Sequence, residues 1–213
     1  MNALFYIVIL IFSVILHEVS HGYMANWLGD PTARLQGRLT LNPISHIDPL
    51  GTIMLPLIMW AAQGFGPSPI LIGYAKPVPY NPYNLPGKFD EALVAGAGPA
   101  TNILLAVIFG LAIRCIGGAE TPLLDAFAII VVVNIWLALF NLIPIPPLDG
   151  SKVLAGILPG PLGRIYEDMR RSLERLGVLG GTLVVLVVFY YVLAPALFGL
   201  LTILFKLLTG ATL

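Results

Sequence analysis

Long runs of apolar residues constrain this chain more than any other feature of its sequence. Residues 93–113 and 177–205 contain no charged side chain, and residues 2–28 and 126–145 are nearly as apolar. A helix needs about 20 mainly apolar residues to cross a bilayer, so each run is long enough. Only 10% of the chain is charged, whereas soluble domains carry about 25%. The sequence therefore predicts an all-α polytopic membrane protein in contact with a lipid bilayer.

The four runs also suggest how the chain is divided. Residues 2–28, 93–113 and 126–145 are the three clearest spans. Residues 177–205 contain Pro195 and form either one long kinked helix or two short ones. We expect one integral-membrane domain over residues 1–213, with a core at residues 1–155 and a C-terminal helical region at residues 156–213. A surface helix is expected at residues 164–175.

The link between the first two spans contains strand-like segments. Residues 33–41 alternate apolar and polar side chains, which predicts a short strand. Residues 64–88 are rich in Pro and Gly and contain the strand-like sequence ILIGY, so we expect a small membrane-associated β-hairpin there. The apolar run at residues 52–62 is short and contains Pro56, which favours a re-entrant or interfacial segment over a span.

The basic residues predict the orientation of the spans, because Lys and Arg concentrate in short cytoplasmic loops. The link between the second and third spans contains neither residue, although Arg114 lies at its edge. Nine of the eleven basic residues follow the first span, precede the second or follow the third: Arg34, Arg38, Lys76, Lys88, Lys152, Arg164, Arg170, Arg171 and Arg175. Placing them in the cytoplasm requires the N-terminus to lie outside.

Charge and cysteine content exclude several classes of protein. Eleven basic and eleven acidic residues cancel, and no basic patch is present, so no nucleic-acid partner is expected. The single cysteine, Cys115, excludes an intrachain disulfide and a thiolate metal cluster. The apolar N-terminus lacks a basic n-region and a small-residue cleavage site, so we expect it to be retained as a span.

The first span contains the sequence HEVSH, with His17 and His21 four residues apart. On a helix this spacing places both imidazoles on one face, where they suit one zinc ion with Glu18 beside them as a general base. The alternative is an accidental motif whose histidines only satisfy hydrogen bonds. Ionisable side chains inside a span are costly and mark function by default, which favours the metal site.

A catalytic zinc ion usually takes three protein ligands, so one ligand remains to be found. Asp149 is the preferred candidate, with Asp48 and His46 as rivals. Asp149 follows the third span in the sequence NLIPIPPLDG, whose prolines cannot continue a regular helix. We expect extended backbone there at membrane depth, which is tolerated only against protein or a water-filled cavity. The predicted topology brings both His21 and Asp149 toward the cytoplasmic half.

Five motifs in this order then point to a known family: HEVSH, NPISHIDPLGT, GYAKPVPYNP, GPATN and NLIPIPPLDG. Together they resemble the site-2 protease family of intramembrane zinc metalloproteases, and most of all its short bacterial and archaeal members without PDZ or CBS domains. The resemblance implies one Zn²⁺ ion held by His17, His21 and Asp149, with Glu18 as catalytic base.

The resemblance also implies a three-helix catalytic core built from the three clearest spans, with its active site inside the membrane toward the cytoplasmic side. Family members cut transmembrane segments of other membrane proteins. We therefore expect a multi-pass protein of a bacterial or archaeal cell membrane whose substrate is a transmembrane protein. The strand-like residues 33–41 or 69–77 could hold that substrate along an edge. The identity of the substrate and the oligomeric state are left open.

Three further polar residues have two possible roles each. Asn141 could hydrogen-bond the substrate backbone or the developing oxyanion, or it could be an amide that packs helices. His46 could support the substrate or the oxyanion, or it could structure its loop. Asn102 has the same catalytic alternative, but helix packing is the favoured interpretation. Gly96, Gly98 and Gly110 are expected to allow close packing of helices.

A membrane zinc-binding or transport protein without hydrolysis is the alternative function. Such a protein would use the same histidines but would have no need for Glu18 between them. It would also need a polar path through several spans. No charged residue or histidine lies between Glu91 and Arg114 or within residues 177–205, which argues against such a path and favours the protease.

Overall fold

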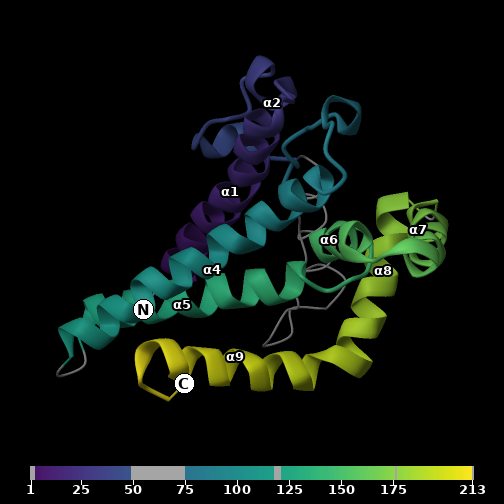
Figure 1. Cartoon of the computed structure of the whole chain (residues 1–213). Helices are drawn as coiled ribbons and strands as arrows, with labels where there is room; N and C mark the ends of the chain where they lie inside the picture. Colours follow the sequence, from purple (N-terminus) through teal and green to yellow (C-terminus); the bar gives the residue numbers. More distant parts are fainter. Residues whose placement is uncertain (1–2, 49–74, 118–120, 176, 213) are drawn as a thin grey trace, which may run out of the picture.

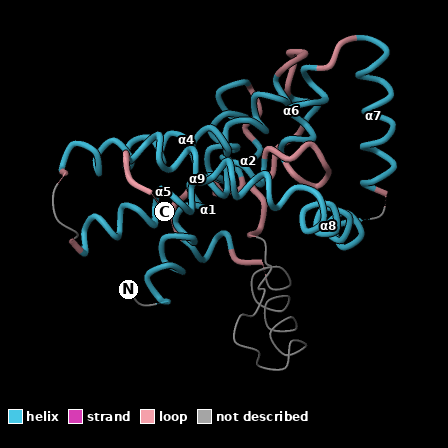
Figure 2. Tube along the Cα trace, turned by 90° about the horizontal axis from the view of Figure 1, so that it is seen from below, coloured by secondary structure: helices cyan, strands magenta, loops and turns pink. Residues whose placement is uncertain are grey.

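The structure is a computed structural model that describes residues 3–48, 75–117, 121–175 and 177–212 of the chain. These residues form helices joined by turns and loops (Figures 1 and 2). Four of the described helical segments are long and apolar enough to cross a membrane: Phe5–Leu28, Asp90–Ile116, Pro122–Asn141 and Tyr191–Thr209. The prediction of an all-α polytopic membrane protein is confirmed by this architecture.

The three clearest predicted spans correspond to α1 (Ala3–Leu28), α4 (Asp90–Ile116) and α5 (Pro122–Asn141). Local signals fix their ends. Thr121 caps α5 by accepting a hydrogen bond from the backbone of Leu124, with a proline at the first helical position. Helix α5 ends at Asn141, three residues before Pro144, whereas the sequence predicted a span that continues to residue 145. Helix α4 contacts both α1 and α5 and thus forms the centre of the bundle.

The C-terminal region bends once and packs back on the bundle. Helix α8 (Gly177–Val188) continues through a π-helical turn at Phe189–Leu193, labelled η4, into α9 (Ala194–Thr209). A helix of the length of α8 rises about 18 Å, which is less than the thickness of the hydrocarbon core. Leu201 and Phe205 of α9 pack against Ala106 of α4 and Val131 of α5. Of the two predicted alternatives, the structure therefore favours one long bent helix over two separate short ones, and its part Tyr191–Thr209 is long enough to cross a membrane.

The polar connections gather at one end of the bundle. They contain the short helices α2 (Thr32–Leu35), η1 (Pro43–His46) and η3 (Pro82–Asn84), and the longer α6 (Asp149–Ile157) and α7 (Gly160–Glu174). Helix α7 confirms the predicted surface helix. Figures 1 and 2 both place the start of α1, the end of α4, the start of α5 and the end of α9 at the opposite end.

The predicted strand at residues 33–41 is wrong. The segment begins with the single helical turn of α2, where the Leu35 amide donates to the Pro31 carbonyl at 2.9 Å. Gly37 then reverses the chain with φ 63°. Ala33 and Arg38 are both buried. The alternation of apolar and polar residues therefore does not come from a β-strand with one buried and one exposed face.

The predicted β-hairpin receives no support either. Residues 75–88 contain no strand and form an irregular segment with the short helix η3. The strand-like ILIGY at residues 70–74 and the short run at residues 52–62 lie outside the described residues.

Candidate metal centre

The structure brings His17, His21 and Asp149 together from two helices that are far apart in the sequence. The carboxylate oxygen Oδ2 of Asp149 lies 3.1 Å from Nε2 of His17 and 3.3 Å from Nε2 of His21. One ligand atom of each residue lies within 4.8 Å of the others. Both histidines are buried in the membrane-spanning part of α1, and Asp149 is the first residue of α6. No second cluster of this kind occurs among the described residues.

The backbone before Asp149 differs from the extended segment that we expected. Residues 142–148 fold into successive turns, in which the Ile145 amide donates to the Ile143 carbonyl at 2.8 Å and the Leu148 amide donates to the Ile145 carbonyl at 3.0 Å. These turns carry the chain from the end of α5 to the start of α6. The prolines do end the regular helix, but compact turns rather than extended backbone position the carboxylate.

The hydrogen bonds of the two imidazoles fix which nitrogen faces Asp149. Nδ1 of His21 lies 2.7 Å from the carbonyl oxygen of Val94, and Nδ1 of His17 lies 2.6 Å from Oδ1 of Asn102. Both partners are acceptors, so each Nδ1 carries the hydrogen and each Nε2 of a neutral ring presents a lone pair. Two imidazole nitrogens and a carboxylate oxygen therefore converge with their lone pairs. This is a donor set that suits zinc.

The absence of a side chain at Gly98 of α4 leaves room in front of the two imidazoles. A Cβ atom at this position would lie 2.5 Å from Nε2 of His21 and 2.6 Å from Nε2 of His17. Sequence reasoning assigned Gly98 to helix packing and missed this role. The signal that it lacked was the place where α4 crosses α1, which spacing along the sequence does not show.

Asn102 is the centre of a buried polar network. Its amide nitrogen donates to Oδ1 of Asn134 at 2.8 Å, and Nδ2 of Asn134 donates to Oγ of Ser13 at 3.0 Å. Because Oδ1 of Asn102 already faces His17, both ends of this amide are engaged within the protein. The network joins α1, α4 and α5 directly behind a candidate metal ligand.

Glu18 follows His17 on α1 and is half-buried. Its carboxylate oxygen Oε2 accepts a hydrogen bond of 3.0 Å from the backbone amide of Val78. Val78 belongs to the irregular segment that precedes α4. The carboxylate thus lies beside the cluster and is held by a part of the chain that sequence reasoning did not connect with it.

The remaining candidates lie outside the cluster. The Asn141 side chain donates to the Leu137 carbonyl of its own helix at 2.9 Å. Nε2 of His46 donates to the Thr40 carbonyl at 2.8 Å, and the helical turn that carries His46 packs on α1. Neither His46 nor Asp48 belongs to the group of residues whose ligand atoms converge.

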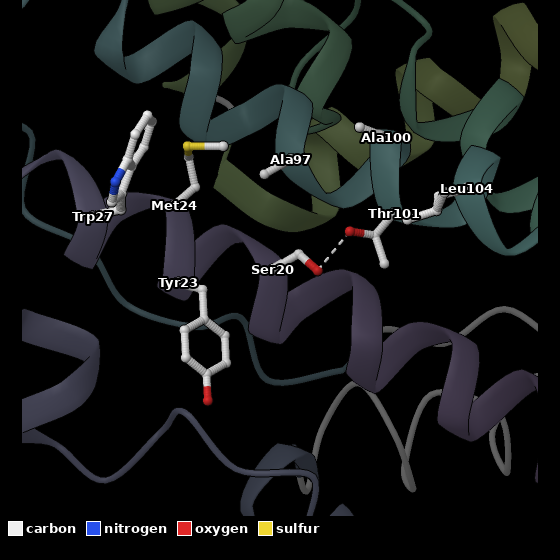
Figure 3. A pocket seen from close by; sticks show the side chains of 8 residues that line it. All are labelled: Ser20, Tyr23, Met24, Trp27, Ala97, Ala100, Thr101 and Leu104. Atoms are coloured by element: carbon white, nitrogen blue, oxygen red, sulfur yellow. Dashed lines mark hydrogen bonds between the residues drawn. The ribbon is translucent and has the colours of Figure 1, made fainter.

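A separate groove of about 410 Å³ lies between α1 and α4 (Figure 3). Thr101 donates to Ser20 across the two helices at 2.7 Å, and Ser20 donates to the Leu16 carbonyl at 2.6 Å. The hydroxyl hydrogens of Thr101 and Ser20 are therefore both engaged in hydrogen bonds. Tyr23 and Trp27, which also line the groove, are exposed. The groove contains none of the convergent ligand residues.

Comparison with known proteins identifies the class of this protein. A Bacillus subtilis protein named "Putative zinc metalloprotease YwhC" is 40% identical over 163 residues, which cover 72% of this chain and 68% of that protein. "Putative zinc metalloprotease Rip2" of Mycolicibacterium smegmatis is 31% identical over 143 residues, which cover 67% of this chain and 52% of that protein. The chain thus spans about half the length of this mycobacterial relative. No solved structure is significantly similar to the chain.

The similarity to these relatives and the four membrane-capable helices identify a zinc metalloprotease with helices able to cross a membrane. Residues 117–187 match the family described as Peptidase family M50. Together with the similarity to the Bacillus protein, this match shows that the chain belongs to peptidase family M50, the site-2 protease family.

Proposed function

We propose that this protein is an intramembrane endopeptidase that hydrolyses peptide bonds in or near transmembrane segments of other membrane proteins. The observation that carries the proposal is the position of the cluster. His17 and His21 lie in a helix long enough to cross the membrane, and Asp149 reaches them from α6. A metal site inside a span serves chemistry at membrane depth.

His17, His21 and Asp149 would hold the zinc ion. When bound, zinc polarises a carbonyl group and lowers the pKa of water. The three residues fit this role because each neutral imidazole presents Nε2 to the cluster and a carboxylate completes the set. We assign no ligand role to His46 or Asp48, since neither lies in the cluster.

Glu18 would act as the general base. Glu18 is next to the candidate ligand His17 in the sequence. Its carboxylate would take a proton from water and deliver it to the leaving amine. Oε2 is bonded to the Val78 amide, and Oε1 is the oxygen proposed for proton transfer. A substrate helix must unwind locally before this step, because a helical carbonyl is covered by its own backbone.

The proposed site faces the cytoplasm. The cluster lies in the second half of α1, toward the end that carries α2, α6 and α7 (Figure 1). Most of the basic residues belong to the same polar connections, and such residues favour the cytoplasmic side. We place the protein in the cell membrane of a bacterium or archaeon, as one domain over residues 1–213.

The test is capture of membrane proteins by the Glu18→Ala variant, followed by mass spectrometry. Each captured protein is then offered to the wild-type protein, to Glu18→Ala and to Asp168→Ala in detergent micelles. Asp168 is exposed on α7 and serves as the matched control. We expect cleavage by wild type and by Asp168→Ala, and at least a hundredfold loss in Glu18→Ala with full zinc content. Substantial residual cleavage by Glu18→Ala would refute the role of Glu18 as general base. Zinc flux into proteoliposomes without any cleavage would favour the alternative of a zinc transport protein.

A further inference from the structure

A segment of the chain whose prolines favour extended backbone crosses α1 at the level of Glu18. We call residues 76–81 the strap. Its prolines at positions 77 and 79 have no amide hydrogen, so it has only four backbone donors. Three of these have acceptors in the structure: Lys76 donates to the His46 carbonyl at 2.9 Å, Val78 to Oε2 of Glu18 at 3.0 Å, and Asn81 to Oδ2 of Asp30 at 2.7 Å. The strap is therefore fixed at its start, middle and end.

Two buried charged residues hold the strap from outside the metal cluster. Arg38 is only 8% exposed, and its Nη2 donates to the carbonyl of Lys76 at 2.9 Å. Asp30 is fully buried and also accepts a hydrogen bond of 2.7 Å from the side chain of Asn84. Buried charges are costly unless they are paired or hydrogen-bonded, so such residues indicate a position that the fold defines closely.

Gly22 shows how closely the strap lies on α1. It follows Glu18 by one helical turn, and a Cβ atom there would lie 2.7 Å from Cγ1 of Val78 and 2.5 Å from Cδ2 of Leu39. Any other residue at this position would require the side chains of Val78 and Leu39 to move. The absence of a side chain at Gly22 thus leaves room for the Val78 side chain against α1, next to the hydrogen bond between the Val78 amide and Glu18.

The strap also contacts the helix that carries the third candidate ligand. The Tyr80 hydroxyl donates to Oε1 of Glu91 on α4 at 3.3 Å. Nζ of Lys152 lies 5.0 Å from the centre of the Tyr80 ring, and Lys152 follows Asp149 by one turn of α6. The strap therefore joins the helix of Glu18 to the helix of Asp149.

We infer that the strap is a positioning element for the reaction, with the Val78 amide orienting Glu18 and with Arg38 and Asp30 holding the strap. The inference rests on the proposed role of Glu18 as general base. A glutamate side chain has three rotatable bonds, and a hydrogen bond from a fixed backbone amide to one oxygen leaves the other oxygen in a defined place. Reactions depend steeply on such placement, because reacting groups must be held within a fraction of an ångström.

Hydrogen exchange tests the contact without any need for cleavage. The full-length protein in detergent micelles is compared with Glu18→Ala and with Glu18→Gln, whose amide oxygen can still accept. We expect the Val78 amide to exchange at least tenfold faster in Glu18→Ala and at the wild-type rate in Glu18→Gln. The Lys76 and Asn81 amides serve as internal controls, because their acceptors are unchanged. An equal rate for Val78 in all three proteins would overturn the inference, whatever the protein cleaves.

Kinetics test whether the contact matters for the reaction. Val78→Pro removes the amide hydrogen, and Val78→Ala keeps it while removing the side chain contacts. The probe is a fluorogenic peptide that contains the transmembrane segment captured by Glu18→Ala. We expect kcat of Val78→Pro to fall at least tenfold below that of Val78→Ala, with KM and zinc content within twofold. Arg38→Met is expected to lower kcat in the same way.

Two results would contradict this positioning role. One is equal kcat for Val78→Pro and Val78→Ala. The other is a parallel loss of zinc and thermal stability in Val78→Pro, since the strap would then be only structural. If no variant and no wild-type protein cleaves any captured segment, the proposed function fails, while the exchange experiment still decides whether the strap holds Glu18.

Discussion

Nδ1 of His17 lies 2.6 Å from Oδ1 of Asn102, 85 residues further along the chain. This bond sets the tautomer of the imidazole, because an amide oxygen can only accept. Asn102 is in turn held by Asn134 on α5. The orientation of a candidate metal ligand on α1 therefore depends on two asparagines from the neighbouring helices.

Removing the amide of Asn102 should weaken zinc binding. Asn102→Leu leaves Nδ1 of His17 without this acceptor. In other metal sites, loss of such a partner lowers metal affinity by roughly 10- to 100-fold. Competition with a fluorescent chelator measures this affinity. Asn141→Ala is the matched control, because its side chain donates only to its own helix in the described structure. Equal affinity in wild type and Asn102→Leu would contradict the role of this bond.

A methyl group at position 98 should also disturb the cluster. Gly98→Ala introduces a Cβ atom that would lie within 2.6 Å of both Nε2 atoms, so we expect zinc affinity to fall by about tenfold or more. Gly96→Ala, two residues earlier on α4, meets only an ordinary contact of 3.8 Å with Val153. Zinc content after dialysis against a weak chelator compares the two variants. A loss of similar size in both would show that helix packing, rather than the cluster, is affected.

Removal of zinc should lower the thermal stability of the protein. A ligand that binds only the folded state stabilises it by about 4 kcal/mol at a thousand times its Kd. EDTA should therefore reduce the Tm of wild type and of Glu18→Ala by similar amounts. It should leave the Tm of His17→Ala nearly unchanged, since this variant has lost a ligand. A wild-type Tm that does not respond to EDTA would argue against the metal site.

The stability that Asp30 contributes should depend on pH. Burial opposes its ionisation, but hydrogen bonds from Thr32, Asn84 and Asn81 hold the pKa of this carboxyl below its ordinary value of 3.8. Because the pKa is lower in the folded state, the contribution is complete above the unfolded value and is lost as the pH falls below it. Asp30→Asn should cost about 1–3 kcal/mol at neutral pH, since it replaces an acceptor oxygen by a donor. Unfolding of both proteins at a series of pH values measures the difference.

The gap between the two proteins should narrow as the pH falls below 3.8. A gap that stays constant down to acid pH would mean that the charge of Asp30 does not contribute. The same comparison for Asp168→Asn, at an exposed position on α7, provides the baseline.

Features that depend on local pattern could be predicted from the sequence. The spans at α1, α4 and α5 follow from apolar length, and the spacing of His17 and His21 places them on one helical face. The need for a third ligand pointed to Asp149, which the structure indeed brings to the two histidines. Gly110 was expected to allow close packing, and a Cβ atom there would lie 2.7 Å from Leu208 of α9.

Features that depend on how helices cross could not be predicted in this way. The partner of Asn102 follows from which face of α4 meets α1, and no spacing within GPATN shows that face. The strand expected at residues 33–41 failed because Arg38 is buried to hold another segment, not to alternate on a sheet. The contact between Val78 and Glu18 joins residues 60 positions apart through a loop without regular structure.

The two prolines of the strap have a further consequence. In an extended chain successive residues face opposite edges, so Pro77 and Pro79 occupy the edge turned away from Glu18. At Pro77 and Pro79 that edge offers carbonyl oxygens but no amide hydrogens, and a β-ladder needs both. Neither another copy of the protein nor an unrelated unfolded chain can therefore extend a sheet from it. The strap, which holds the proposed base Glu18, is protected against aggregation at this edge by the same two prolines that favour extended backbone.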